Sequence, residues 1–158
     1  MLCHPIEPVF DSNSRILILG SFPSVKSREA QFFYGHPQNR FWKVMAAVLN
    51  TQVPQTVDEK RALLLSSNIA LWDVIASCDV TGSSDSSIRN VVPNDLGHIL
   101  DTANIRKIFV NGKTAEKYYY KYLRSATGRD AICLPSTSPA NAGWSFERLC
   151  EAWNAILT

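Results

Sequence analysis

The sequence predicts an α/β fold, a three-layer α/β/α sandwich built around a short, mostly parallel four-stranded sheet. Two observations indicate it. Four short apolar segments have the composition of buried strands, and the stretches between them carry apolar residues at helical spacing. Strands with no polar face are typical of parallel sheets that helices cover on both sides. The chain has 158 residues, so we expect a single domain over residues 1–158.

The first half of the chain supplies two of the predicted strands. Residues 15–20 are a run of isoleucine and leucine closed by a glycine, and residues 68–74 form a second buried segment. Between them, residues 39–49 place large apolar side chains on one helical side, and residues 58–66 form a further helix. This part of the chain therefore contributes two strands and two helices.

The second half repeats this alternation. Residues 93–103 begin with Pro-Asn-Asp, a favourable helix start, and residues 107–110 form a third strand closed by Asn-Gly. A tyrosine-rich helix is predicted over residues 113–125, and a fourth strand over 131–134 ends at a proline. An amphipathic helix over residues 145–157 follows the last strand.

Composition and charge exclude several classes of protein. The hydrophobic fraction of 46% is that of an ordinary globular chain, and no apolar run is long enough to span a bilayer. The first ten residues lack the basic and apolar regions of a signal peptide. We therefore expect a soluble cytoplasmic protein, associated with the nucleoid if its source is prokaryotic.

The net charge of +2 is too small to indicate a partner, but its distribution is uneven. Between residues 104 and 129 a single acid, Glu116, stands among basic residues. Such a stripe suits a polyanion, but a solvated helix face is the favoured interpretation. The basic residues are Arg106, Lys107, Lys113, Lys117, Lys121, Arg124 and Arg129.

In parallel sheets, ligands bind beyond the carboxyl ends of the strands, which directs attention to three loops. In the first, Asn39 stands just before a helix, and by spacing alone a helix cap is favoured over catalysis. In the second, the Asp73 carboxylate either caps a neighbouring loop or contacts a substrate. The third, residues 134–143, is rich in serine, threonine and proline and either contacts phosphates or simply connects two elements.

At these loops the chain resembles a known family. The segment Gly-Ser-Phe-Pro at 20–23, followed by His-Pro-Gln-Asn-Arg-Phe-Trp at 36–42, is similar to the first motif region of the mismatch-specific uracil/thymine-DNA glycosylases. Residues 134–142 are similar to the second motif of the uracil-DNA glycosylase superfamily, and residues 109–113 to the strand-to-helix segment before it. The resemblance covers residues 15–145 and implies the fold predicted above.

One departure indicates the branch. The mismatch-specific enzymes carry their catalytic asparagine in a Gly-x-Asn-Pro loop, where this chain has Phe22. Together the Gly-Ser-Phe-Pro form, the Leu-Trp-Asp-Val strand end, the Ser84–Ser86 segment and the Pro-Ser-Thr-Ser-Pro-Ala loop resemble the deoxyinosine (hypoxanthine) glycosylase branch. In that branch the asparagine of His-Pro-x-Asn is catalytic, so the resemblance implies that Asn39 is catalytic and not only a cap.

The resemblance implies a monofunctional hydrolase that flips a deaminated base out of DNA and leaves an abasic site for base excision repair. A neutral amide such as that of Asn39 can hold a water through its oxygen and donate from its nitrogen. We expect Phe22 or Phe33 to stack on the base, Ser136 and Ser138 to hold phosphates, and a wedge to fill the vacated space. The expected base-binding residues are Gly20, Ser21, Phe22, Pro23, Phe33, Asp73 and Asn111. The expected DNA-binding residues are His36, Ser136, Thr137, Ser138, Pro139, Ala140 and Asn141, of which the last three form the wedge.

DNA with a deaminated base is the expected partner, and we expect a monomer. No cofactor is expected. The four cysteines form no Cys-x-x-Cys pair and lack the spacing of the iron–sulfur branches, so we expect buried free thiols and neither metal nor cluster.

Other functions stay open. The same fold could prefer uracil or a mismatched thymine, or could be a catalytically idle nucleic-acid-binding module. An unrelated nucleotide-binding protein is disfavoured, because neither glycine-rich phosphate motif follows the first strand.

Overall fold

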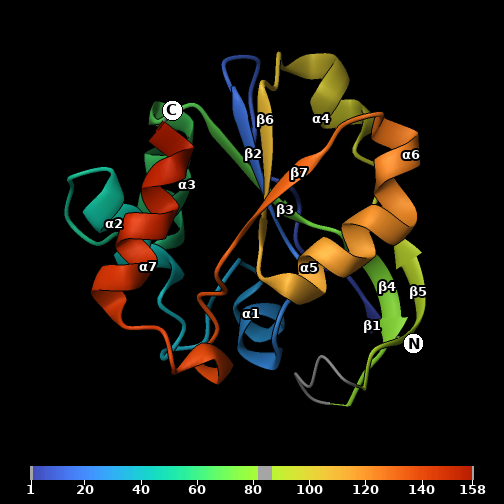
Figure 1. Cartoon of the computed structure of the whole chain (residues 1–158), viewed down its shortest axis with the longest axis horizontal. Helices are drawn as coiled ribbons and strands as arrows, with labels where there is room; N and C mark the ends of the chain where they lie inside the picture. Colours follow the sequence, from blue (N-terminus) through green and yellow to red (C-terminus); the bar gives the residue numbers. More distant parts are fainter. Residues whose placement is uncertain (1, 82–86, 158) are drawn as a thin grey trace.

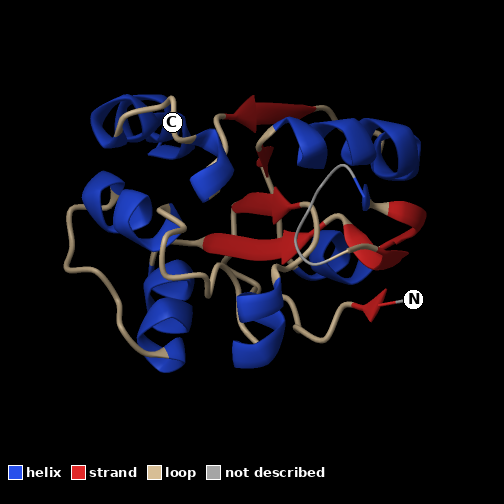
Figure 2. Ribbon diagram, turned by 90° about the horizontal axis from the view of Figure 1, so that it is seen from below, coloured by secondary structure: helices blue, strands red, loops and turns tan. Residues whose placement is uncertain are grey.

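The computed structural model describes residues 2–81 and 87–157. At its centre is a parallel sheet with the strand order β3-β2-β6-β7 (Figures 1 and 2). The strands are β2 (Ile16–Gly20), β3 (Ile69–Asp73), β6 (Lys107–Asn111) and β7 (Ala131–Leu134). All four predicted strands and the predicted three-layer architecture are therefore confirmed.

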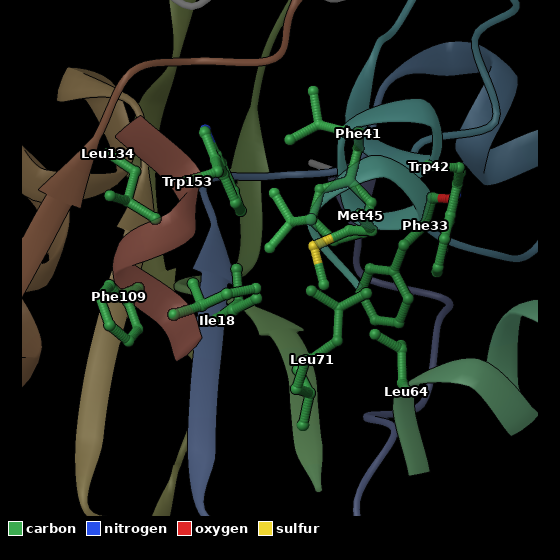
Figure 3. Close-up of a cluster of buried hydrophobic side chains, with 14 of the residues drawn as sticks. Ile18, Phe33, Phe41, Trp42, Met45, Leu64, Leu71, Phe109, Leu134 and Trp153 are labelled. Carbon is green, nitrogen blue, oxygen red and sulfur yellow. The ribbon is translucent and has the colours of Figure 1, made fainter. Parts of the chain in front are cut away.

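Side chains alternate between the two faces of the sheet, and each face has its own apolar cluster. Ile18 of β2 points toward α2 (Phe41–Val48), α3 (Val57–Ser66) and α7 (Phe146–Trp153). Figure 3 shows the large side chains of this cluster, with Phe41, Met45 and Trp153 meeting above the strands. The interlocked aromatic and aliphatic groups hold the start of α2 rigidly against the sheet.

Leu17 and Leu19 of β2 point to the opposite face. That face is covered by α4 (Gly97–Thr102) and by a continuous helical stretch made of α5 (Lys113–Tyr118), the π-helical η2 (Tyr119–Leu123) and α6 (Arg124–Thr127). The stretch corresponds to the single predicted helix over 113–125. The central strands thus lie between helices on both sides (Figure 2).

A second, antiparallel sheet was not predicted. It consists of β1 (Leu2–Cys3), β4 (Ile75–Asp79) and β5 (Arg89–Pro93) in the order β1-β4-β5. Only Val74 separates β3 from β4, so no turn residue in the sequence marks the start of a second strand after the predicted segment 68–74. The β4–β5 ladder also has register shifts, and β5 is largely exposed, so neither strand shows the alternation that would reveal it.

The prediction of a helix from residue 93 is wrong, because Pro93 ends β5 opposite Ile75 and α4 begins only at Gly97. A short helix, α1 (Val25–Ala30), lies in the segment that was expected to be a loop. It is capped by Ser24, whose side chain accepts from the amide of Ser27.

The carboxyl ends of the parallel strands meet at one edge of the sheet. Gly20 of β2 is in register with Asp73 of β3, and Asn111 of β6 with Leu134 of β7. In Figure 1 this edge is the lower one, with α1 beneath it. No helix among the described residues is long and apolar enough to cross a membrane.

Candidate active site

A cavity of about 420 Å³ opens at the carboxyl edge of the sheet. The carboxyl ends of β2, β3 and β6 and the loops after β2 and β7 all contribute to its wall, as the strand-end rule predicts. Of the residues expected to bind the base or DNA, all but Asn141 line it. Asn141 lies in an adjoining depression that shares part of the same wall. The structure thus brings together residues that are up to 120 positions apart in the chain: Gly20, Ser21, Phe22, Pro23, Phe33, His36, Asn39, Asp73, Asn111, Ser136, Thr137, Ser138, Pro139 and Ala140.

Asn39 lies just before the amino end of α2, two residues before the helix begins. Its Oδ1 accepts from the backbone N–H of Phe41 at 2.9 Å and from the hydroxyl of Thr137, also at 2.9 Å. The N-cap of α2 is Arg40 and not Asn39 as the spacing suggested, but the Asn39 side chain still accepts from the first N–H of the helix. With both lone pairs of Oδ1 engaged, the expected use of this oxygen to hold a water is not compatible with the structure.

The nitrogen of the same amide is differently placed. Nδ2 of Asn39 makes no hydrogen bond to any described residue, and Asn39 lines the cavity while only half-buried. The amide therefore presents a donor, rather than an acceptor, to whatever occupies the cavity.

The position of Thr137 differs from that expected of a DNA-binding residue. Its side chain is fully buried, and its hydroxyl is engaged by both Asn39 and the Nδ2 of Asn111, the latter at 3.0 Å. The backbone N–H of Thr137 donates in turn to Oδ1 of Asn111 at 3.1 Å. Because it is buried and engaged on both sides, this threonine cannot make the DNA contact expected for it. It instead joins the end of β6 to the segments that follow β2 and β7.

Asp73 is nearly buried and has a partner that the sequence did not indicate. Its Oδ2 lies 2.7 Å from Nε2 of His4, and both side chains are almost inaccessible to solvent. Nδ1 of His4 accepts from the backbone N–H of Ile6 at 3.2 Å, so the imidazole proton is on Nε2 and is donated to Asp73. No periodicity or motif marks His4, which reaches the site from the short strand β1.

Tyr34 is the second site residue that the sequence did not indicate. It adopts a left-handed backbone conformation (φ 54°) and stacks on Phe41, with ring centroids 4.1 Å apart. Its hydroxyl is buried and has no well-formed hydrogen bond among the described residues. Burial first, and the Asp73 carboxylate second, raise the pKa of Tyr34 far above its usual value, against a small opposing effect of Asn111. The phenol therefore keeps its proton and is available as a donor.

Gly20 explains how Asp73 and Tyr34 reach the same end of the cavity. A Cβ at this position would lie 2.3 Å from Oδ1 of Asp73 and 2.7 Å from the Tyr34 hydroxyl. Only glycine leaves room for both oxygens beside the strand end. The carboxylate oxygen that His4 does not use and the buried phenol oxygen thus both lie against Gly20, and both residues line the cavity.

The expected stacking role of Phe33 is not compatible with its position. Its side chain is 2% exposed and belongs to the core cluster, where it packs edge-on against Phe32. Phe22 is half-buried, with its ring edge-on to His4 and near the Arg28 guanidinium. Phe22 therefore remains a candidate for stacking on a base, and Phe33 supports the wall from behind.

The loop after β7 is stabilised by hydrogen bonds between its serine hydroxyls and its own backbone. Ser136 Oγ accepts from the N–H of Ser138, and Ser138 Oγ accepts from the N–H of Ala140 at the start of the short 3-10 helix η3 (Pro139–Asn141). Asn141 donates back to the carbonyl of Ser136. Ala140 is exposed at the tip, where the expected wedge would meet DNA.

Arg40 joins this loop to α2. Its guanidinium donates to the carbonyls of Asn141 and Trp144, and its backbone N–H donates to the carbonyl of Thr137. Next to it, His36 is half-buried on the cavity wall, and its Nδ1 accepts from the N–H of Gln38. The His-Pro-Gln-Asn-Arg string thus holds the two motif loops together as well as lining the site.

Little of the basic stripe reaches the site. Lys113 lines the cavity at the start of α5. Arg124 pairs with Asp130, and Arg129 donates to the carbonyl of Ile105, so both have structural contacts. Among the residues with assigned positions, no group of three His, Cys, Asp or Glu side chains is arranged to hold a metal. All four cysteines are free, but only Cys78 is fully buried and Cys3 is exposed.

Comparisons with known proteins identify the family. The family model of the uracil DNA glycosylase superfamily matches residues 7–157. The chain belongs to that superfamily. The Ser84–Ser86 segment, which contributed to the branch prediction, lies outside the described residues.

Two relatives are similar in sequence to this chain over most of their length. A protein of Methanosarcina acetivorans named hypoxanthine DNA glycosylase is 36% identical over 158 residues, covering 99% of this chain and 98% of its own. One of Methanosarcina barkeri with the same name is 33% identical over 136 residues, 85% of each chain. A solution NMR structure of an M. acetivorans protein described as a uracil DNA glycosylase matches with a TM-score of 0.83 and 34% identity, covering 99% of this chain and 96% of that one. The predicted family and branch are confirmed.

Proposed function

We propose that the protein is a monofunctional DNA glycosylase that removes hypoxanthine from deoxyinosine. The observation that carries the proposal is the pairing, on one cavity wall, of an acceptor from Asp73 with a donor from Tyr34, facing the same cavity as the amide of Asn39. The names of the two Methanosarcina relatives support the same substrate.

The donor–acceptor pair distinguishes a deaminated base from the unmodified base that it derives from. Hypoxanthine carries an N1–H donor beside its O6 acceptor, whereas adenine carries an N1 acceptor beside an amino donor. The Asp73 carboxylate, which already accepts from His4, can accept only, and the Tyr34 phenol keeps its proton. With adenine, the N1 acceptor would face the Asp73 carboxylate and the amino group would face the Tyr34 hydroxyl. Acceptor would then meet acceptor and donor would meet donor, and leaving these buried groups unpaired is costly. Uracil offers the same lactam edge as hypoxanthine and is the alternative substrate.

The reaction breaks the bond between C1′ of the sugar and N9 of the base. A water adds its oxygen to C1′, one proton goes to the departing base, and the products are an abasic site and free hypoxanthine. Positive charge grows on the sugar and negative charge on the base in the transition state. We assign Nδ2 of Asn39 as the donor that stabilises the departing base, a role that needs no charged nucleophile.

The test is strand cleavage by alkali after incubation with matched oligonucleotides that carry deoxyinosine, deoxyuridine or mismatched thymidine. We expect deoxyinosine to be processed fastest. Lys113 also lines the cavity, so borohydride trapping checks the monofunctional assignment, and no trapped adduct is expected. Binding to DNA without cleavage of any of these bases would favour the idle binding module instead.

Replacing Tyr34 by phenylalanine is expected to separate stability from function. The variant loses an unpartnered buried hydroxyl, so its free energy of unfolding should rise by about 1 kcal/mol. Its excision of hypoxanthine should fall at the same time, because the donor to O6 is lost. The raised pKa of Tyr34 means that the wild type loses stability as the pH rises above about 10, where only the unfolded chain ionises this phenol.

Thermal unfolding of the wild type and of Tyr34→Phe, at pH 7 and above pH 10, measures the change in stability. Excision rates of the two proteins measure the change in function. The gain in stability of the Tyr34→Phe variant should widen at the higher pH. An equally stable variant with unchanged excision would contradict the role given to this hydroxyl.

DNA affinity should depend only weakly on salt, since few basic residues reach the cavity. We expect the slope of log K against log salt concentration to be no steeper than about −3. Lys113→Ala should reduce the slope by about 1, because this residue lines the cavity, whereas Lys117→Ala on the exposed side of α5 should not change it. Fluorescence anisotropy with abasic-site DNA measures both, and a steep slope would indicate many more phosphate contacts.

A further inference from the structure

The fully buried hydroxyl of Thr137 joins the loops after β6 and β7 to the start of α2. It lies 2.9 Å from Oδ1 of Asn39 and 3.0 Å from Nδ2 of Asn111. The backbone of the same residue contributes two more bonds, from its N–H to Oδ1 of Asn111 and from the N–H of Arg40 to its carbonyl. All four bonds link segments that are far apart in the sequence.

The direction of each hydrogen bond follows from the groups involved. Oδ1 of Asn111 accepts from a backbone N–H, so its Nδ2 must face Thr137 and donate to the hydroxyl. Oδ1 of Asn39 accepts from the backbone N–H of Phe41, so the hydroxyl must donate its single proton to that oxygen. One arrangement of protons satisfies the whole chain of bonds, and it directs Nδ2 of Asn39 away from Thr137.

We propose that Thr137 is a positioning residue that holds the Asn39 amide with its nitrogen toward the substrate. The assignment rests on the proposed function, in which that nitrogen donates to the departing base. The terminal torsion of an asparagine side chain is weakly restricted, and a single hydrogen bond from the Phe41 N–H to Oδ1 leaves the amide able to rotate. The Thr137 hydroxyl supplies the second anchor, and Asn111 in turn orients that hydroxyl. Thr137 itself does not touch the base.

Three variants separate positioning from packing. Thr137→Val keeps the shape of the side chain but removes the hydroxyl, and Thr137→Ser keeps the hydroxyl but removes a methyl group. Ser14→Ala is the matched control, because Ser14 is fully buried too and its hydroxyl accepts from the N–H of Asp11, just before the amino end of β2 and far from the cavity.

The rate of excision under single-turnover conditions is the first readout, with a deoxyinosine oligonucleotide. Thr137→Val should slow excision by about 10- to 100-fold, since misplacement of a reacting group by about 1 Å has effects of up to this size. Its affinity for abasic-site DNA should stay within about twofold of the wild type, because the loss is confined to the chemical step. Thr137→Ser should recover most of the rate, and Ser14→Ala should keep the rate of the wild type.

The second readout does not depend on activity. In ¹⁵N-labelled protein, the side-chain amide signals of Asn39 are identified by their loss in Asn39→Ala. They should shift in Thr137→Val and return toward their original positions in Thr137→Ser. A merely structural threonine would move signals throughout its surroundings in both variants.

The outcomes distinguish this inference from the function on which it rests. If the wild type excises hypoxanthine or uracil and Thr137→Val is equally fast, or Thr137→Ser is as slow as Thr137→Val, the positioning role is overturned and the proposed function stands. Unshifted Asn39 amide signals in Thr137→Val would overturn it as well. If the wild type excises no base, the proposed function fails and the positioning role falls with it.

Discussion

Replacing Asn39 by alanine is expected to slow hypoxanthine excision by about 100- to 1000-fold, the usual cost of removing an oriented donor to developing negative charge. Nδ2 of this residue is the group that faces the cavity, and alanine removes it. Alanine also removes the acceptor of the Phe41 N–H, which should lower the free energy of unfolding by about 1 kcal/mol. Single-turnover strand cleavage and thermal unfolding measure the two effects.

Asn39→Asp separates these two losses. An aspartate keeps an oxygen for the Phe41 N–H and for Thr137, but it places a second oxygen where the donor was. We expect it to be as slow as Asn39→Ala while remaining close to wild-type stability. Asn104→Ala, in an exposed position away from the cavity, is the matched control. If Asn39→Asp were as fast as the wild type, Asn39 would act through its oxygen and the donor assignment would be wrong.

Asp73→Asn is expected to have the larger effect on excision, with a loss of hypoxanthine excision of about 1000-fold or more. The Nε2–H of His4 needs an acceptor, so the new amide would turn its oxygen toward His4 and its nitrogen toward the cavity. The wall would then present a donor to the N1–H of hypoxanthine. Two donors facing each other in a closed site exclude the base, because neither can find a partner.

Excision rates on deoxyinosine and deoxyuridine oligonucleotides test this change. Both substrates carry the lactam edge, so both should be lost together, while affinity for abasic-site DNA, which has no base, should persist. Asp58→Asn, an exposed carboxylate in the first turn of α3, controls for the change in net charge. Unchanged excision of deoxyinosine by Asp73→Asn would mean that this carboxylate does not contact the base.

The position of the site could be predicted from the sequence because buried parallel strands leave a clear signature. Their runs of isoleucine, leucine and valine have no polar face, and their carboxyl ends must meet at one edge. Asp73 was predicted as a site residue from its place at a strand end, and Asn39 from the resemblance of its His-Pro-x-Asn segment. The antiparallel strands β4 and β5 could not be predicted, since their pairing is irregular and both carry polar residues.

The roles of individual side chains depend on contacts that no spacing reveals. Phe33 and Tyr34 are adjacent aromatic residues in one loop, and only the left-handed turn at Tyr34 decides that Phe33 enters the core while the phenol of Tyr34 reaches the cavity wall. Thr137 could not be distinguished from its serine neighbours, although it is buried and they are not.

The sequence by itself determined the α/β class, the parallel sheet, the family and the loops that form the site, because these follow from local composition and from motifs within single segments. The tertiary structure alone decided which groups meet in the cavity and which way they point. His4 donates to Asp73 across 69 positions, and Thr137 donates to Asn39 across 98. Hydrogen bonds of this kind depend on how separate segments pack together, so the direction of each donor is a property of the assembled fold.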